Sequence, residues 1–426
     1  MSFALGVLPV ALLLLGFPIY IVLLAAVTVA LVFFMNVPFA ALHQNLFGAI
    51  DAFALLAVPF FIYAGELMGR GSVASRIVDL VQAGIGRLPG SLGVTTVGTS
   101  AIFGAISGAS AATVATVGKA MLPAMRRANY PEPFAAGLIT AVGAIDIIIP
   151  PSIPMIVYGM AAQESVPRLY AAGVLPGLLI AGMLAAYVVW YSKKHGFESG
   201  TPFSAAVFFR SMYRGIWALG APLIILGGIY GGVFSPTEAA AVACVYAALV
   251  TWLVFRELGW REVVEAAATT VLFTGQVLII VACAGVFAWL LTVNQVPAAM
   301  VAWLESMNIS NWELLLAINV VLLAVGCFLD PLSSILLLTP LLIPMVKAAG
   351  IDTVHFGVVV AVNLAIGLFH PPFGINIFVA QSTLKLKLEV IYRGIVPFIF
   401  IYLAALMLIT YVPEISLAGV KLFLRI

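Results

Sequence analysis

Long apolar segments recur from one end of the chain to the other, and each is bounded by Pro, Gly or charged residues. Residues 2–34 would form a helix of about 50 Å at about 1.5 Å per residue, whereas a bilayer's hydrocarbon core is about 30 Å thick. We therefore divide this stretch at Gly16-Phe17-Pro18 into two spans. The pattern as a whole predicts an all-α polytopic membrane protein.

Several apolar segments are interrupted by helix-breaking residues. Residues 91–124 and 312–346, broken at a Ser/Gly-rich and an Asp-Pro tip, predict re-entrant hairpins that enter and leave on one side. Residues 133–163 and 353–382, each broken by Pro-Pro, predict crossings with an unwound middle. Irregular backbone within a bilayer is tolerated only inside protein or beside water, so we expect all four breaks to line a site.

The two halves of the chain align without a gap at a shift of 221 residues. The matched positions include helix breakers: Pro123 with Pro344, Pro150-Pro151 with Pro371-Pro372, and Pro176 with Pro397. Each half is expected to make about five crossings plus one hairpin, and because five is odd the second half must be inverted. Inverted repeats with broken helices at equal positions are typical of secondary transporters. The predicted organisation is a first repeat at 1–191, a cytoplasmic connector at 192–214, a second repeat at 215–413 and a tail at 414–426.

Two segments beside the hairpins, 72–88 and 296–308, are too polar to span a membrane. We expect them to lie at the interface as amphipathic helices and to act as hinged arms. With the N-terminus outside, fifteen of the nineteen Lys and Arg residues fall on the cytoplasmic side, as the positive-inside rule requires. This orientation places both termini in the periplasm.

The composition agrees with a membrane protein and argues against several other classes. Hydrophobic residues make up 64% of the chain and charged residues only 8%, whereas about 25% is usual for soluble proteins. The net charge of +2 gives no reason to expect nucleic acid as a partner. The sequence has no P-loop, H-E-x-x-H or G-x-S-x-G motif, and its four His residues are scattered. These absences argue against an ATPase or another enzyme.

The two hairpin tips concentrate oxygen-bearing side chains. GAISGASAAT, residues 104–113, offers hydroxyls and flexible glycines, although small residues can also serve helix packing. GCFLDPLSSILLLTP, residues 326–340, places Asp330 in an apolar run, where a charge costs about 2.5–3.5 kcal/mol or more. Asp330 is therefore either functional or a helix cap. The candidate polar residues of the tips are Ser107, Gly108, Ser110, Thr113, Asp330, Ser333 and Ser334.

The Pro-Pro breaks read IDIIIPPSIPM at 145–155 and LFHPPFGINIF at 368–378. Proline frees the carbonyl one turn earlier, and freed carbonyls suit a hard monovalent cation. His370 could carry a proton or be a hydrogen-bonded structural residue, and Asp146 could be linked to an ion or exposed to water. The other polar side chains beside the breaks are Ser152, Asn363 and Asn376. Around all four breaks, the side chains expected to contact substrate are Ser110, Thr113, Ser334 and Asn363.

Two acidic residues have ordinary structural interpretations. Glu238 follows Ser235 and Pro236, a pattern that predicts a capped helix start. Glu66 is expected at a cytoplasmic helix end, solvated or paired with Arg70.

Five segments together resemble the large membrane subunit, of the DctM type, of tripartite ATP-independent periplasmic (TRAP) transporters. They are GVFSPTEAAAVA, VPFFIYAGELM, GAISGASAATVATVG, ANYPEPFAAGLITAVGAIDIIIPPSIPMIVYG and NLAIGLFHPPFGINIF. The resemblance covers essentially the whole chain. It implies an elevator-type carrier in a bacterial or archaeal inner membrane. It also implies sodium-coupled uptake of an organic acid delivered by a soluble periplasmic binding protein, and a small four-helix membrane partner on a separate chain.

The resemblance also implies where sodium binds, namely at the hairpin tips and the opposed helix breaks. Carried over to this sequence, the sodium ligands are Ser107, Gly108, Ser110, Pro150 and Pro151, then Asp330, Ser333, Pro371, Pro372 and Asn376. Two alternatives stay open: a stand-alone ion-coupled dicarboxylate carrier of similar architecture, and a membrane enzyme or scaffold. The substrate itself is not identified by the sequence.

Overall fold

The computed structural model describes residues 3–35, 37–197, 200, 202–307 and 309–424, so residue 308 of the second predicted arm and both chain ends lie outside it. These residues form helices and connecting loops, with no strand among them. Within this part of the chain, seven helices are long and apolar enough to cross a membrane. They are Phe53–Arg70, Val166–His195, Ala205–Tyr230, Pro236–Val254, Trp260–Val293, Pro331–Ala348 and Leu388–Tyr411.

The first half begins with the two predicted spans, which separate at a turn before Pro18. Its elements are η1 (Phe3–Val7), α1 (Leu8–Leu14), α2 (Ile19–Phe34), α3 (Phe39–Ile50), η2 (Phe53–Leu56), α4 (Ala57–Arg70), α5 (Val73–Ile85), α6 (Ser91–Ser107), α7 (Ser110–Arg127), α8 (Glu132–Val142), η3 (Gly143–Ile147), α9 (Ile153–Ala162) and α10 (Val166–His195). Here α6 and α7 form the predicted hairpin, and α8 with α9 the broken helix.

The second half repeats this order. Its elements are α11 (Ala205–Tyr230), α12 (Pro236–Leu249), η4 (Val250–Val254), α13 (Trp260–Val293), α14 (Val296–Met307), α15 (Asn311–Gly326), α16 (Pro331–Ala348), α17 (Thr353–Gly367), α18 (Ile375–Leu384), α19 (Leu388–Tyr411) and α20 (Glu414–Leu424). The hairpin of α15 and α16 and the broken helix of α17 and α18 match their counterparts in the first half. The repeat therefore extends to the order of helices.

Several features differ from the sequence-based map, including α11, which begins at Ala205 within the expected connector. Helix α3 was not expected; together with η2 and α4 it matches the single long helix α13 of the second half. Helix α10 continues to His195, beyond the predicted end of the first repeat at 191. Residues of the predicted tail form α20, which packs on α10 with Gly419 against the backbone of Ala171. Small side chains at such contacts let two helix backbones approach closely.

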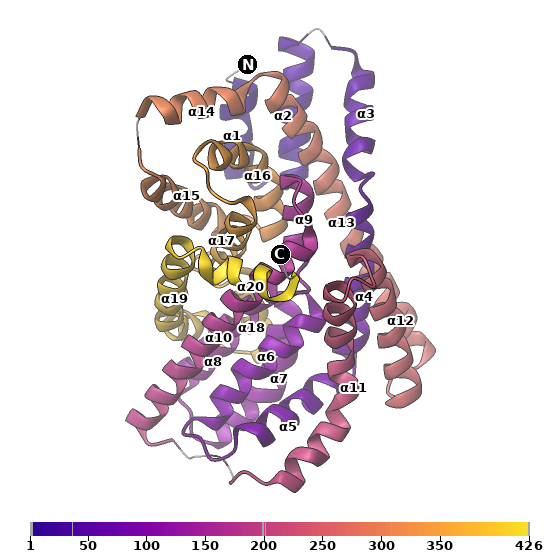
Figure 1. Ribbon diagram of the computed structural model, residues 1–426, viewed down its shortest axis with the longest axis vertical. Coiled ribbons are helices and arrows are strands. Elements are labelled where there is room, and N and C mark those ends of the chain that lie inside the picture. The colour runs from indigo at the N-terminus through magenta and orange to yellow at the C-terminus, as the bar shows by residue number, and fades with distance from the viewer. Residues whose placement is uncertain (1–2, 36, 198–199, 201, 308, 425–426) are drawn as a thin grey trace.

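The helices differ in how much of their surface is buried. In α8 every residue from Phe134 to Val142 is buried, and in α17 every residue from Val354 to Gly367. By contrast, α11 and α13 expose large apolar side chains such as Leu223 and Val271. A helix that is apolar all round is either a buried core helix or a membrane span. Figure 1 shows α14, α15 and α16 in the upper half of the molecule and α5, α6 and α7 in the lower half, so the two hairpins come from opposite ends.

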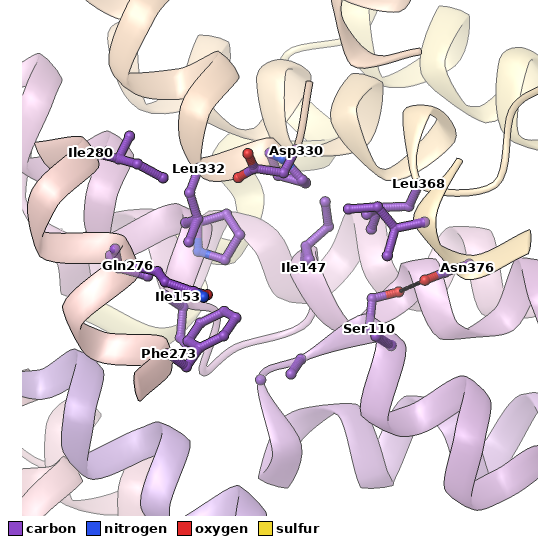
Figure 2. A pocket seen from close by; sticks show the side chains of 17 residues that line it. Ser110, Ile147, Ile153, Phe273, Gln276, Ile280, Asp330, Leu332, Leu368 and Asn376 are labelled. Carbon is purple, nitrogen blue, oxygen red and sulfur yellow. Dashed lines mark hydrogen bonds between the residues drawn. The ribbon is translucent and has the colours of Figure 1, made fainter. Parts of the chain in front are cut away.

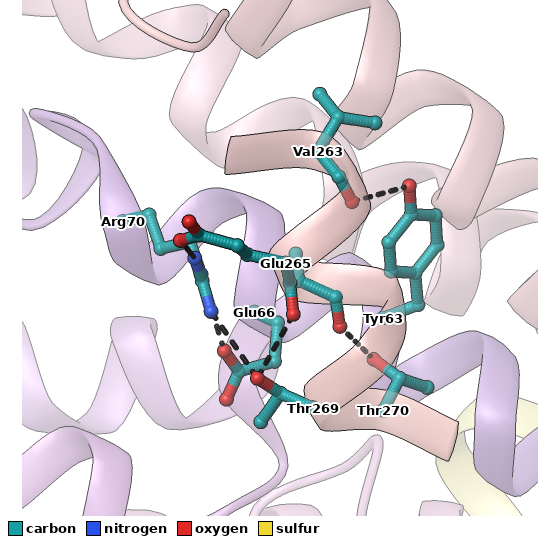
Figure 3. A network of polar contacts seen from close by, with 8 residues as sticks. Tyr63, Glu66, Arg70, Val263, Glu265, Thr269 and Thr270 are labelled. Carbon is teal, nitrogen blue, oxygen red and sulfur yellow. Dashed lines mark hydrogen bonds and ion pairs between the residues drawn. The ribbon is translucent and has the colours of Figure 1, made fainter. Parts of the chain in front are cut away.

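Helices α4 and α13, which are counterparts in the two repeats, are joined by polar contacts (Figure 3). Arg70 of α4 forms ion pairs with Glu66 at 3.5 Å and with Glu265 of α13 at 3.2 Å, and it also donates to Thr269 at 3.2 Å. The predicted pairing of Glu66 with Arg70 is thus confirmed. We refer to the unit built from α1 to α4 and α11 to α13 as the scaffold.

Both predicted arms form separate short helices, α5 and α14. Helix α5 packs between α11 of the scaffold and α6, and α14 packs against α16. The start of α5 is tied to the loop before α13, because Glu257 accepts the backbone N–H of Ser72 at 2.7 Å and pairs with Arg76 at 3.2 Å. Each arm therefore connects the scaffold to one hairpin.

Candidate functional site

A cavity of about 270 Å³ lies where both hairpin tips meet the scaffold (Figure 2). Most of its lining is apolar, and none of the lining residues is Lys, Arg or His. The polar side chains that reach it are Ser110, Gln276, Asp330 and Asn376. A concave, mostly apolar site with a few polar groups is the usual form of a small-molecule site.

Four helices begin at this cavity. The lining includes Ser110, Ile153, Pro331 and Ile375, which are the first residues of α7, α9, α16 and α18. A helix N-terminus presents unpaired N–H groups and the positive end of the helix dipole. The two tips and the two breaks thus direct four partial positive charges at one cavity.

The first tip turns at Gly108, which has a left-handed φ of 59° that favours glycine. The turn is closed by Ser107, whose hydroxyl donates to the Ala109 carbonyl at 3.1 Å and accepts the Ala109 N–H at 3.1 Å. A Cβ built on Gly108 would lie 3.9 Å from the Pro151 carbonyl oxygen. The first tip and the first break therefore face each other.

The second tip is organised by Asp330, the N-cap of α16. Its carboxylate accepts the Ser333 N–H at 3.1 Å and the Ser333 hydroxyl, and Pro331 occupies the first helical position. The capping role is therefore confirmed, and the same carboxyl group also lines the cavity. Ser334 is buried, and its hydroxyl has no hydrogen-bond partner among the described residues.

The first break is a short 3₁₀ segment, η3, followed by Pro150-Pro151 with a cis peptide bond. Ser152 caps α9 by accepting the Met155 N–H at 3.4 Å, and it donates to the Ile147 carbonyl at 2.7 Å. Ser152 therefore has a structural role.

At the second break, Pro371-Pro372 is also cis. Tyr392 donates to the Pro372 carbonyl at 3.0 Å. The His370 Nδ1 atom lies 2.5 Å from the Pro371 carbonyl oxygen and 3.2 Å from Cys327 Sγ. His370 is thus engaged by local groups, and it does not line the cavity.

The first tip and the second break are joined directly. The Ser110 hydroxyl lies 3.0 Å from Asn376 Oδ1 and 2.8 Å from Asn376 Nδ2, and this Nδ2 also donates to the Thr140 carbonyl at 3.3 Å. A Cβ built on Gly143 would lie 3.1 Å from the Ser110 carbonyl oxygen, so no larger residue fits there without movement. The two repeats therefore share one polar cluster.

The predicted site residues fall into two groups. Gly108, Ser110, Asp330 and Asn376 line the cavity. The remaining predicted residues, which do not line it, are Ser107, Thr113, Pro150, Pro151, Ser333, Ser334, Asn363, Pro371 and Pro372. Among them, Asn363 donates to Asn319 at 2.5 Å, and Thr113 donates to Asp146.

The scaffold side of the cavity was not predicted from the sequence. This wall is formed by four residues of α13, namely Phe273, Gln276, Val277 and Ile280. Figure 2 labels Phe273, Gln276 and Ile280 beside the tips. Gln276 is a polar amide within an apolar span, and this is the signal that could have identified it.

Comparison with known proteins places the chain in a family. Residues 6–415 match the family model described as "Tripartite ATP-independent periplasmic transporter, DctM component". The C4-dicarboxylate TRAP transporter large permease protein DctM of Rhodobacter capsulatus is 37% identical over 96% of both chains. The ectoine TRAP transporter large permease protein TeaC of Halomonas elongata is 39% identical, again over 96% of both.

A longer relative and a solved structure extend the comparison. The isethionate TRAP transporter permease protein DctMQ of Oleidesulfovibrio alaskensis is 40% identical over 94% of this chain, which spans 64% of that protein's length. The crystal structure of the YdaH transporter of Alcanivorax borkumensis has a TM-score of 0.63 at 16% identity, over 90% of this chain and 88% of that one, and thus shares its fold. The chain belongs to the DctM component family of tripartite ATP-independent periplasmic transporters, and it is a multi-pass transporter permease rather than an enzyme.

Proposed function

We propose that this chain is the large subunit of a TRAP transporter that takes up an organic acid together with sodium. The observation that carries the proposal is the convergence of four helix N-termini on a cavity whose lining lacks Lys, Arg and His. Helix N-termini bind anions without a basic side chain. The cavity of about 270 Å³ suits a small carboxylate.

The residues present also fit a bound monovalent cation. Asp330 reaches the same cavity as the helix N-termini, and a carboxylate there repels an anionic substrate unless a cation neutralises it. Hydroxyls and backbone carbonyls at the tips and breaks are oxygen ligands suited to a hard cation. The residues expected to hold sodium are Ser107, Gly108, Ser110, Pro150 and Pro151 in one half, with Asp330, Ser333, Pro371, Pro372 and Asn376 in the other.

The arrangement supports an elevator mechanism. The hairpins and broken helices pack on one another through Ser110 and Asn376, and they meet the scaffold along α4 and α13. Arms α5 and α14 connect the two units. In the proposed movement, the hairpins and broken helices carry the site across the membrane as one body, while the scaffold stays in place.

The proposed partners are a periplasmic binding protein that delivers the acid and a separate small membrane subunit with four helices. The proposed location is the inner membrane of a bacterium or archaeon. The relatives are named for isethionate, C4-dicarboxylate and ectoine, so the proposal extends to a class of substrate and not to one compound.

Uptake into proteoliposomes that hold this chain and its small subunit tests the proposal. A labelled organic acid should accumulate when an inward sodium gradient and the loaded binding protein are both present. Uptake that persists with choline in place of sodium and an imposed proton gradient would contradict sodium coupling. Uptake of free acid without the binding protein would favour the alternative, a stand-alone carrier.

A further inference from the structure

Asp146 is a fully buried carboxyl group whose surroundings do not satisfy it. It lies in η3, immediately before the first Pro-Pro break, and its exposed fraction is 0%. Thr113 of α7 donates to its Oδ2 atom, while its Oδ1 atom has no hydrogen-bond partner within the part of the chain that the structure describes. Among the described residues, no ion pair involves it. A buried carboxylate is costly unless it is paired, hydrogen-bonded or bound to a cation.

The fold makes room for this carboxyl group. A Cβ built on Gly104 of α6 would lie 2.6 Å from the Asp146 Cγ atom, so only glycine leaves the space the carboxyl occupies. Thr113, which donates to the carboxyl group, and Ser107 place two buried hydroxyls together, with their oxygens 3.5 Å apart. The side chain is therefore enclosed by a glycine and faces a small group of oxygen atoms.

The repeat shows that this carboxyl is not a requirement of the fold. At the shift of 221 residues, Asp146 matches Gly367, whose backbone packs on Gly326 of the second hairpin. Conversely, Asp330 of the second tip matches Ala109 of the first. Each half thus has one carboxyl group at its tip or break, at positions that do not correspond.

We propose that Asp146 supplies the negative charge of a monovalent-cation site in the first half, with the Thr113 and Ser107 hydroxyls as further oxygen ligands. A cation bound to the carboxylate would balance its buried charge and give Oδ1 the partner it lacks. This inference rests on the proposed sodium coupling. It adds a ligand in the first half that plays the part Asp330 plays in the second.

Sodium-dependent thermal stability of the purified chain in detergent tests the inference without any transport assay. A ligand that binds only the folded state raises its stability in proportion to ln(1 + [L]/Kd). Sodium chloride is titrated against choline chloride at constant ionic strength. Asp146→Asn, which keeps the size and the hydrogen bond to Thr113, should raise the sodium concentration for half-maximal stabilisation at least tenfold. Asp79→Asn, at an exposed position on α5, should match the parent protein.

A second pair of variants covers the case in which Asp146→Asn does not fold. Thr113→Val removes the hydroxyl and should weaken the sodium response, while Thr113→Ser should preserve it. The inference is overturned if Asp146→Asn responds to sodium like the parent, or if the two Thr113 variants respond equally. Sodium coupling itself still stands in that case, because the parent protein responds to sodium. A parent protein that does not respond to sodium overturns both.

Discussion

The hydroxyl of Ser110 and the amide of Asn376 lie within 3.0 Å of each other, although 266 residues separate them in the chain. Ser110 begins α7 at the first hairpin tip, and Asn376 lies in the first turn of α18 after the second break. Both are buried, and both line the cavity. This contact makes the site a joint product of the two repeats.

We expect Ser110→Ala and Asn376→Ala each to lower uptake about tenfold, because each removes one side of the buried hydrogen-bonded pair that joins the two repeats. Such a loss costs about 1–3 kcal/mol. The double variant should lose much less than the two single losses added together, since residues in one hydrogen-bonded pair are coupled. Initial uptake rates in proteoliposomes measure this coupling. Strictly additive losses would show that the pair does not act as a unit.

Gly65 of α4 is a point of close contact between the scaffold and the first hairpin tip. A Cβ built there would lie 2.6 Å from the Ser107 carbonyl oxygen, and backbone cannot move away cheaply. Gly65→Ala should therefore separate the tip from the scaffold and reduce uptake at least tenfold. Gly69→Ala is the control one turn further along α4, because its Cβ would meet only the Phe103 ring at 3.9 Å. Equal uptake by the two variants would refute a tight contact at Gly65.

Asp330 has two roles that substitution can separate. Asp330→Asn keeps an oxygen that can cap α16 but removes the charge, so we expect normal thermal stability and a sodium requirement raised at least tenfold. Asp330→Ala should in addition destabilise the protein by about 1 kcal/mol through loss of the cap. Thermal unfolding and sodium-dependent uptake measure the two effects. If Asp330→Asn keeps the parent's sodium dependence, Asp330 is a cap alone.

Gly137 of α8 and Gly394 of α19 let these two helices touch. A Cβ built on Gly394 would lie 2.9 Å from the Gly137 backbone nitrogen. Ala at either position should overpack this contact and destabilise the protein by about 1–3 kcal/mol. Gly182→Ala on α10 is the control, since no atom lies within 4 Å of its added Cβ and Ala favours a helix. In detergent, the midpoint of thermal unfolding should be lower than the parent's for the Gly137 and Gly394 variants and unchanged for Gly182→Ala.

Glu257 ties the first arm to the scaffold outside the membrane spans. Burial alone would raise the pKa of its carboxyl group, but hydrogen bonds from Ser72 and Arg76 outweigh burial and lower it. A lowered pKa stabilises the folded state above the ordinary carboxyl pKa of about 4.3, and this contribution is lost as the pH falls through the lowered value.

We therefore expect Glu257→Gln to lower the free energy of unfolding at neutral pH by up to about 1 kcal/mol. The stability of this variant should also lack the part of the pH dependence that comes from the Glu257 carboxyl group. Glu305→Gln, at an exposed position on the other arm, should leave the pH profile of thermal unfolding unchanged. If the unfolding midpoint of Glu257→Gln equals the parent's at every pH, the contacts of Glu257 with Ser72 and Arg76 do not stabilise the protein.

The sequence by itself determined the class of the protein, its repeat and the positions of its breaks. These follow from local physics: apolar runs of membrane length, prolines that remove backbone hydrogen bonds, and a shift of 221 residues that matches breaker with breaker. The caps at Ser235 and Asp330 were predictable for the same reason, since a cap involves only residues adjacent in the chain. Helix α3 and α20 were missed because their packing partners, α13 and α10, lie far away in sequence.

Only the tertiary structure decided which breaks meet. The pairing of Ser110 with Asn376, the separation of Asn363 from the cavity and the wall contributed by Gln276 each depend on the packing of helices distant in sequence. The burial of Asp146 likewise depends on tertiary packing. The sequence is compatible with a water-exposed carboxyl group, whereas in the structure α6 and α7 enclose it. A linear pattern records which residues are polar, but the partners and burial of a polar group depend on three-dimensional packing, and these decide what it can bind.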